Sequence, residues 1–330
     1  MEGFIRIGLF AGALMLVTVA CKANKYGKMA PVIEDHKKQL DAEPCSPSKT
    51  RKLSAALARA DQPQEALEVL RNHCSNCEAD DQVLEALLVL EEEHGDAEHA
   101  LEAARKRYEL APSSPEVVAK LAELLDATGK QDEMLQLLIA QFGASPHAPE
   151  SIQQLAVALE KKGEPCEALV YWTLLSKWSR KHRGKADTAM ARLARKNECR
   201  NVLPSKSTEL ATEMSDENLY MFPAEIGGAS LHVGYDTASG FTYLPKAALS
   251  RIKGAKSLNQ RVAFATAYGN LEGDLYRLPG LRMGDVTIGP FDAVVLPRLT
   301  AKHDGMLGNT ITSRFRMKRL DKTKWEIHPL

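Results

Sequence analysis

The sequence predicts a chain of two folded parts that belong to different classes, an α-helical solenoid followed by an all-β domain. Three observations predict this. Leucines recur with a period of about 34 residues between positions 53 and 169. After Cys199, short apolar runs separated by Gly and Pro replace this period, which is typical of short strands. One of these runs ends in Asp236-Thr237-Ala238-Ser239, and Met306-Leu307-Gly308 follows about seventy residues later.

The first residues have the pattern of an export signal. Arg6 supplies a positive charge, and the fourteen apolar residues 7–20 are too few for a comfortable membrane span. We therefore interpret residues 1–20 as a signal peptide and residues 21–45 as a linker. The segment ends Val-Thr-Val-Ala-Cys, which resembles a bacterial lipobox with Cys21 as the lipidated residue. Ordinary cleavage after Ala20 is the alternative. Export predicts a cell-envelope protein, either periplasmic or anchored by lipid to the outer membrane.

Export would also place the remaining cysteines in a compartment where disulfides form. They are Cys45, Cys74, Cys77, Cys166 and Cys199. The C-x-x-C spacing of Cys74 and Cys77 is also found in zinc and redox sites, but zinc needs about four ligands and only His73 lies nearby. A structural disulfide or free thiols is the favoured interpretation, and no metal or other cofactor is predicted. Cys166 and Cys199 are expected to clamp the end of the helical part.

The helical part repeats at a constant step. Two series of leucines share this step: Leu53, Leu87, Leu121 and Leu155, and Leu67, Leu101, Leu135 and Leu169. Turns fall between the two series at the same step, and Pro63 and Pro165 occupy the start of the second helix, where a missing N–H costs nothing. Each helical hairpin has an apolar stripe that it cannot bury alone, so the hairpins are expected to stack.

This pattern resembles the tetratricopeptide family, with four repeats over about residues 46–180. Residues 186–199 are interpreted as a capping helix, so that the helical region spans 46–199. The resemblance implies that the concave face binds peptides or partner proteins, whose identity the sequence does not reveal. A spacer or dimerisation scaffold is the alternative.

The second domain is predicted at residues 218–330, after a polar linker at 200–217. Its apolar runs are 219–226, 229–235, 261–266, 274–278, 283–288 and 293–296. A series of short strands of this kind predicts an all-β barrel or sandwich.

The order of motifs in this domain resembles that of retropepsin-like aspartic proteases, including bacterial Gag-polyprotease-like ones. The family reads Asp-Thr-Gly-Ala/Ser and later apolar-apolar-Gly, so Asp236 would be the catalytic residue, and Thr237, Ala238 and Ser239 would complete its loop. The second half of the motif corresponds to Met306, Leu307 and Gly308. The resemblance covers nearly all of the predicted second domain and implies a closed β-barrel of the acid protease fold. It also implies a flap at Ala267, Tyr268 and Gly269, and a dimer sheet that includes Trp325-Glu326-Ile327.

Aspartic proteolysis needs two carboxylates that share one proton. The ionised carboxylate takes a proton from the attacking water, and the protonated one donates to the scissile carbonyl. This chain has one such loop, because Asp292 and Asp304 lie outside the motifs. The resemblance therefore implies a symmetric homodimer with Asp236 from each subunit on the two-fold axis, where the Thr237 hydroxyl would brace the two loops.

Ala238 stands where the family has Gly. A methyl group there would crowd the carboxylates, and a positive φ would be costly for any residue except Gly. Two hypotheses follow. The protein is an aspartic endopeptidase whose repeats recruit protein partners or substrates, or it is a catalytically inactive retropepsin-fold scaffold or peptide-binding protein.

Charge and motif content argue against other classes of protein. Lys plus Arg equals Asp plus Glu at 43 each, which gives no support for nucleic-acid binding. Neither His-Glu-x-x-His nor Gly-x-Ser-x-Gly occurs, so the sequence does not support a zinc protease or a serine hydrolase.

Overall fold

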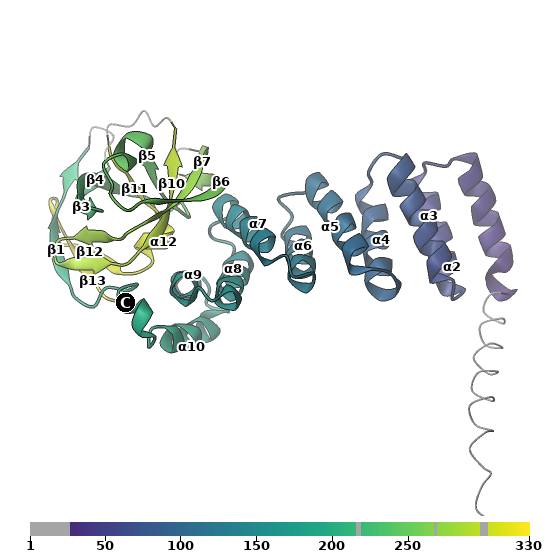
Figure 1. Cartoon of the computed structure of the whole chain (residues 1–330), viewed down its shortest axis with the longest axis horizontal. Coiled ribbons are helices and arrows are strands. Elements are labelled where there is room, and N and C mark those ends of the chain that lie inside the picture. Colours follow the sequence, from purple (N-terminus) through teal and green to yellow (C-terminus); the bar gives the residue numbers. More distant parts are fainter. Residues whose placement is uncertain (1–26, 216–218, 267–268, 298–302) are drawn as a thin grey trace, which may run out of the picture. The chain divides into compact units, whose positions relative to one another are not determined.

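The computed structural model describes residues 27–330 except 216–218, 267–268 and 298–302. The predicted signal peptide and Cys21 lie outside the described residues. The chain divides into two compact units, residues 1–129 and 130–330. The described part of the first unit is helical, and the second combines helices with strands (Figure 1). No helix in the described part of the chain is long and apolar enough to span a membrane.

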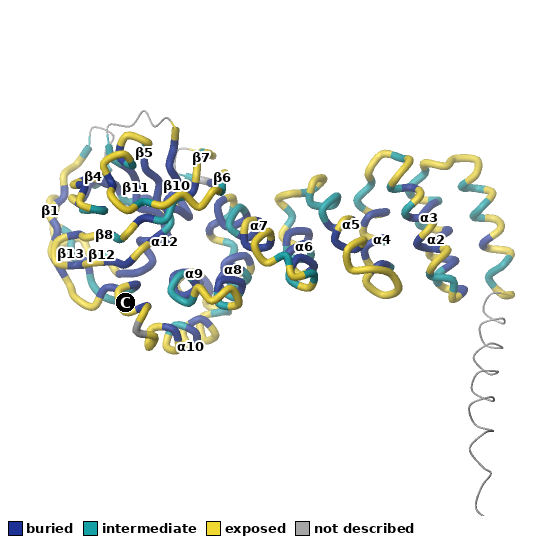
Figure 2. Tube along the Cα trace, in the orientation of Figure 1, coloured by how far each residue is buried: buried dark blue, intermediate teal, exposed yellow. Residues whose placement is uncertain are grey.

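The first unit is a row of helices that pack on one another in chain order (Figure 1). A helix at residues 27–42 precedes α2 (Pro47–Arg59), α3 (Pro63–Asn76), α4 (Asp81–His94), α5 (Ala97–Leu110) and α6 (Pro115–Ala127). Buried and exposed stretches alternate along these helices (Figure 2), and the leucines of the repeat period are buried. The helix at 27–42 occupies much of the predicted linker 21–45, because its Ile33 packs against the apolar face of α2.

Helix ends in this unit follow from local sequence. Pro63 lies in the first turn of α3, and the Asp80 carboxylate accepts a hydrogen bond from the Val83 amide at the start of α4. Asp96 caps α5 in the same way, through the amide of Glu98. Pro63 and Asp96 thus start α3 and α5 at two of the turns that the period predicts.

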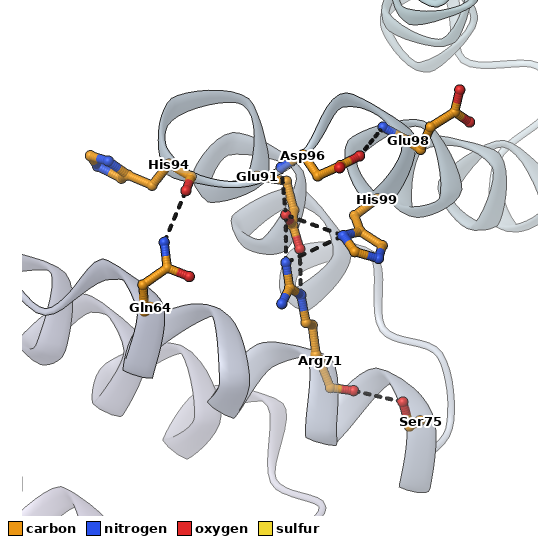
Figure 3. Close-up of polar contacts among 8 residues, drawn as sticks. All are labelled: Gln64, Arg71, Ser75, Glu91, His94, Asp96, Glu98 and His99. Carbon is orange, nitrogen blue, oxygen red and sulfur yellow. Dashed lines mark hydrogen bonds and ion pairs between the residues drawn. The ribbon is translucent and has the colours of Figure 1, made fainter.

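An ion pair with a buried carboxylate joins α3 to α4 (Figure 3). The Glu91 side chain is fully buried, and its two oxygens accept from Arg71 Nε at 2.6 Å and Nη2 at 2.8 Å. The Asp96 amide donates to Oε2 at 3.2 Å, and His99 Nδ1 lies 4.0 Å from the same oxygen. A Cβ on Gly95 would lie 2.0 Å from this oxygen, so a side chain at position 95 would displace the Glu91 carboxylate.

Cys74 and Cys77 of the C-x-x-C sequence do not form a disulfide with each other. Cys77 forms a disulfide with Cys45, which ties the segment before α2 to the end of α3. Cys74 is a free thiol on α3, and burial raises its pKa. The described residues contain no cluster of three or more metal-ligating side chains.

The second unit begins with helices of the same repeat. They are α7 (Gln131–Ala144), α8 (Pro149–Lys162), α9 (Pro165–Trp178) and α10 (Arg183–Leu193), followed by a 3₁₀ turn at Asn197–Cys199. Helix α8 ends at Gly163, whose φ of 84° suits glycine. The expected disulfide between Cys166 and Cys199 is present and ties this turn to α9.

The remaining elements form a β-sheet domain. In chain order they are β1 (Thr208–Ala211), β2 (Glu213–Met214), β3 (Tyr220–Ile226), β4 (Ala229–Tyr235), β5 (Thr242–Pro245), α11 (Lys246–Leu249), β6 (Lys256–Thr266), β7 (Gly269–Leu278), β8 (Leu281–Met283), β9 (Val286–Ile288), β10 (Phe291–Leu296), β11 (Gly305–Leu307), α12 (Asn309–Thr312), β12 (Arg316–Arg319) and β13 (Lys324–His328). The larger sheet has the order β6-β7-β10-β5-β11-β4-β3-β8-β9, with β2 paired to β3. Among the described strands this path has two ends, so the closed barrel implied by the resemblance is not seen.

The smaller sheet, in the order β1-β13-β12, changes two expectations. Strands β1 and β2 lie inside the predicted linker 200–217, which is therefore shorter than predicted. Thr208 pairs with Ile327, because the alternating residues of β1 complete the apolar core on this side. Strand β13, which contains Trp325-Glu326-Ile327, has β1 on one side and β12 on the other. Its backbone is thus paired on both sides within its own chain, so it offers no free edge to a partner's strand.

Candidate active site

Two distant parts of the sequence meet at Asp236. Strand β4 runs parallel to β11, with Gly305 opposite Val233 and Leu307 opposite Tyr235. Directly after this pairing, the Asp236 amide donates to the Leu307 carbonyl at 3.0 Å. The structure thus brings the Asp236 loop and the Met306-Leu307-Gly308 segment together.

The Asp236 carboxylate is almost completely buried, at 4% exposed, and has three hydrogen-bond donors. Its Oδ1 accepts from the backbone amides of Ala238 at 2.9 Å and Ser239 at 3.2 Å. Its Oδ2 accepts from the Tyr243 hydroxyl at 3.3 Å. A carboxylate removed from water needs such donors, and these hold it in one orientation.

A second layer of hydrogen bonds holds the loop to α12. The Asn309 amide donates to the Ser239 carbonyl at 2.8 Å, and Asn309 Nδ2 donates to the Thr237 carbonyl at 2.9 Å. The Thr310 amide donates to the Gly240 carbonyl at 3.0 Å. The buried Ser239 hydroxyl donates to the Phe241 carbonyl at 2.7 Å. The loop is therefore fixed along its length by the segment that follows the second motif.

Gly308 is required by close approach of two backbone segments. A Cβ at this position would lie 2.1 Å from the Phe241 carbonyl oxygen, closer than real Cβ contacts come. Met306 and Leu307 are buried in β11 between β4 and β5. The apolar-apolar-Gly pattern thus consists of two core residues and one position where only glycine fits.

Within one chain, Ala238 neither needs a positive φ nor crowds the Asp236 carboxylate. It is not among the described residues with positive φ, so its backbone conformation does not require glycine. Its side chain is exposed, and its amide keeps the hydrogen bond to Asp236. Thr237 is exposed beside it.

The predicted flap is described only in part. Ala267 and Tyr268 lie outside the described residues. Gly269 begins β7 with a φ of 106°, and its carbonyl accepts from the Thr266 hydroxyl at 2.8 Å. Thr266 and Gly269 are the last paired residues of the β6–β7 hairpin.

Two residues of this site were not identified as such from the sequence. Tyr243 carries no motif signal, because a Tyr in a buried strand is usually a core residue. Asn309 directly follows Gly308, and its place beside the second motif was the one signal that could have marked it. The other aspartates have partners of their own. Asp304 pairs with Arg251 and accepts from the His232 amide at 2.8 Å, and Asp292 pairs with Arg277. Neither makes a described contact with Asp236.

Comparison with known proteins agrees with this geometry in the β-sheet domain. Residues 222–311 match the family described as aspartyl protease, a stretch that includes the Asp236 loop and Gly308. No curated protein matches the chain. The chain thus has an aspartyl protease family domain that follows a tetratricopeptide-like helical repeat region.

Several solved structures show distant likeness to this chain. A crystal structure of MamA is 20% identical with a TM-score of 0.36, and the match covers 53% of this chain and 96% of that one. YrrB, a TPR protein with an unusual peptide-binding site, is 14% identical with a TM-score of 0.39, over 51% of this chain and 86% of its own. The helical repeats are instead identified from the helices and the period of this chain itself.

Proposed function

We propose that this protein is an exported aspartic endopeptidase that hydrolyses peptide bonds with two Asp236 carboxylates, one from each subunit of a homodimer. The observation that carries the proposal is the buried Asp236 carboxylate, held by the amides of its own loop where β4 meets β11. The match of this stretch to the aspartyl protease family supports it.

The proposed reaction follows from the chemistry of paired carboxylates. Two carboxyl groups a few ångströms apart share one proton, because both cannot easily ionise. The ionised group accepts a proton as water attacks the peptide carbonyl carbon, and the protonated group donates to the carbonyl oxygen. The resulting diol then breaks its C–N bond as the amine leaves with a proton. One chain contributes one carboxylate, so the proposal requires a second copy, with the exposed Thr237 beside the meeting point.

The helical repeats are proposed to recruit protein partners or substrates. A groove of about 670 Å³ lies along the first helices, and Val32 and Val89 on its walls are more than two-fifths exposed. Arg51, Lys52 and Arg59 also line it, beside the acidic Glu85. This mixture of apolar and charged side chains suits a peptide segment. The segment 1–21 is proposed to direct the protein to the cell envelope, with Cys21 as a lipid anchor.

A cleavage assay tests the proposal. A recombinant chain that begins at Lys22 would be incubated with a mixed peptide library from pH 4 to 7.5, with molar mass recorded by light scattering. We expect cleavage products, detected by mass spectrometry, to depend on dimer formation. We also expect them to disappear in Asp236→Asn, which keeps the shape of the side chain but cannot act as the base.

Asp304→Asn is the matched control, because it removes a carboxylate of the same domain that has no described contact with Asp236. It should cleave like the parent. Cleavage by Asp236→Asn at the parent rate would contradict the proposal. No cleavage by a folded, dimeric parent would favour an inactive retropepsin-fold scaffold, and attention would then turn to the repeat groove.

A further inference from the structure

Helix α7 of the repeat array packs directly on the catalytic loop. The ring of Phe142 is fully buried and lies edge-on to the ring of Phe241, with centroids 5.1 Å apart. A Cβ on Gly240 would lie 2.9 Å from Pro146 Cβ and 3.0 Å from Phe142 Cε1. Since Gly240 has no positive φ, this close approach is the reason that it is glycine.

The same helix also packs on strand β6. A Cβ on Gly143 would lie 2.7 Å from the Ala263 carbonyl oxygen, so α7 and β6 touch backbone to backbone. Gln260 Nε2 donates to the Gln136 carbonyl at 3.2 Å. Strand β6 in turn carries Phe264, whose ring lies 5.5 Å from that of Tyr243, the donor to Asp236 Oδ2. Helix α7 is therefore linked to the carboxylate by two routes, through Phe241 of the loop and through Phe264 and Tyr243.

Helix α9 holds α7 in this place. The Tyr171 ring lies edge-on to Phe142, with the ring centroids 5.1 Å apart. Glu167 of α9 pairs with Arg277 of β7, which also pairs with the partly buried Asp292 of β10. Lys177 Nζ donates to the Thr312 carbonyl of α12 at 3.3 Å. These contacts anchor the helices to three different elements of the sheet domain.

From this arrangement we propose that Phe142 is a positioning residue for the Asp236 loop, and that α7 and α9 form the outer support of the site. The hydrogen bonds from α12 hold the loop at the carbonyls of Ser239 and Gly240. Phe142 supports the same loop through its contacts with Gly240 and Phe241. Without the ring, the loop loses its apolar backing and the carboxylate loses its single orientation. The proposal that this affects catalysis rests on the proposed function, whereas the effect on the loop does not.

Hydrogen exchange in the full chain tests the effect on the loop. In Phe142→Ala we expect the amides of the 236–243 segment to exchange at least about tenfold faster than in the parent. Leu155→Ala is the matched control, because it removes a fully buried side chain from α8 in the same helical region. Equal exchange of this segment in the two variants, compared at equal global stability, would overturn the proposal. If Phe142→Ala does not fold, Phe142→Leu gives the same comparison with a smaller cavity.

The cleavage assay tests the effect on catalysis. We expect Phe142→Ala to lower kcat at least about tenfold with a smaller change in KM, because a displaced carboxylate impairs the chemical step more than binding. Phe142→Leu should recover most of the rate. An increase in cleavage in Phe142→Ala would mean that α7 obstructs the site, which contradicts a positioning role. If the parent cleaves nothing, the proposed function fails while the exchange comparison still decides whether Phe142 supports the loop.

Discussion

At the scale of single residues, the two motif positions with small residues, Ala238 and Gly308, differ in whether glycine is required. Ala238 replaces the family's glycine without a positive φ and with its side chain exposed. Gly308 cannot be replaced, because its α-carbon faces the Phe241 carbonyl. The sequence showed both positions as parts of one motif, but only the backbone contacts distinguish a required glycine from a replaceable one.

We therefore expect opposite results from exchanging these residues. Gly308→Ala should lower the free energy of unfolding by at least about 1–3 kcal/mol, because the methyl group forces β11 and β5 apart. Ala238→Gly should lower it by only about 0.4–1 kcal/mol, through greater freedom of the unfolded chain. Urea denaturation followed by circular dichroism measures both. A strong stabilisation in Ala238→Gly would show that the alanine is strained after all.

At the scale of elements, the helices of the first unit are joined by polar groups as well as by leucines. Glu91 lies at a position where the period gives no special signal, yet it is fully buried and paired with Arg71. Removing Arg71 should destabilise this unit, because the Glu91 carboxylate would stay buried without its partner. The sequence predicted the helices and turns from their period. It could not predict this pair, since nothing in a run of three glutamates identifies the buried one.

The turn beside this pair provides a test. Gly95→Ala should destabilise the first unit, because the new Cβ would displace the Glu91 carboxylate from Arg71. Gly184→Ala is the control, because Gly184 is a helical glycine with open space around it, and alanine there should be neutral or stabilising by up to about 1 kcal/mol. Loss of the helical signal at 222 nm on heating compares the two. Equal midpoints in the two variants would contradict the predicted clash.

His73 makes the packing of α3 on α2 sensitive to pH. Its side chain is 4% exposed, Nδ1 lies 2.9 Å from the Thr50 hydroxyl, and Nε2 has no hydrogen-bond partner among the described residues. Burial lowers the pKa of His73 below its ordinary value of 6.5. The neutral form therefore stabilises the fold fully above pH 6.5, and this stability is lost as the pH falls from 6.5 through the folded-state pKa.

We expect the parent to lose stability between pH 7 and 5 more steeply than His73→Gln, by up to about 1.4 kcal/mol per pH unit. Glutamine keeps a hydrogen-bonding side chain and cannot take up the proton. Urea midpoints across this pH range provide the measurement. Parallel curves for the two proteins would show that His73 is not the group responsible.

At the scale of the whole molecule, the boundary between folding units does not coincide with the boundary between helices and strands. The sequence placed the boundary at residues 200–217, where the period ends. The contacts place α7 to α10 with the sheet domain instead. A change of period marks a change of secondary structure, but it cannot reveal that Phe142 and Glu167 pack on residues one hundred positions away. Motifs predicted Asp236 and its partner segment. No motif marked Tyr243, because only the folded chain shows that it contacts Asp236.

Fragments test this boundary. A chain of residues 130–330 should fold and unfold cooperatively, because it contains both sides of the Glu167–Arg277–Asp292 cluster. A chain of residues 200–330 should not fold stably. It would expose Phe241 and leave the buried Arg314 without its cover from α9, where burial now lowers the pKa of Arg314 to about 10. Circular dichroism and amide NMR dispersion would compare them, and a well-dispersed spectrum from the shorter chain would contradict this boundary.

The packing of Phe142 against Gly240 also limits which repeat units this array can gain or lose. The residues one and two periods before Phe142 are Tyr108 and Cys74, so this position of the repeat is not uniform along the chain. A copied or deleted repeat unit upstream of Gly129 would preserve every contact of α7 with the sheet domain. Deletion of the unit that contains α7 would instead remove Phe142 from Gly240. Repeats can thus be gained or lost upstream of α7, whereas the unit that contains α7 is tied to the site.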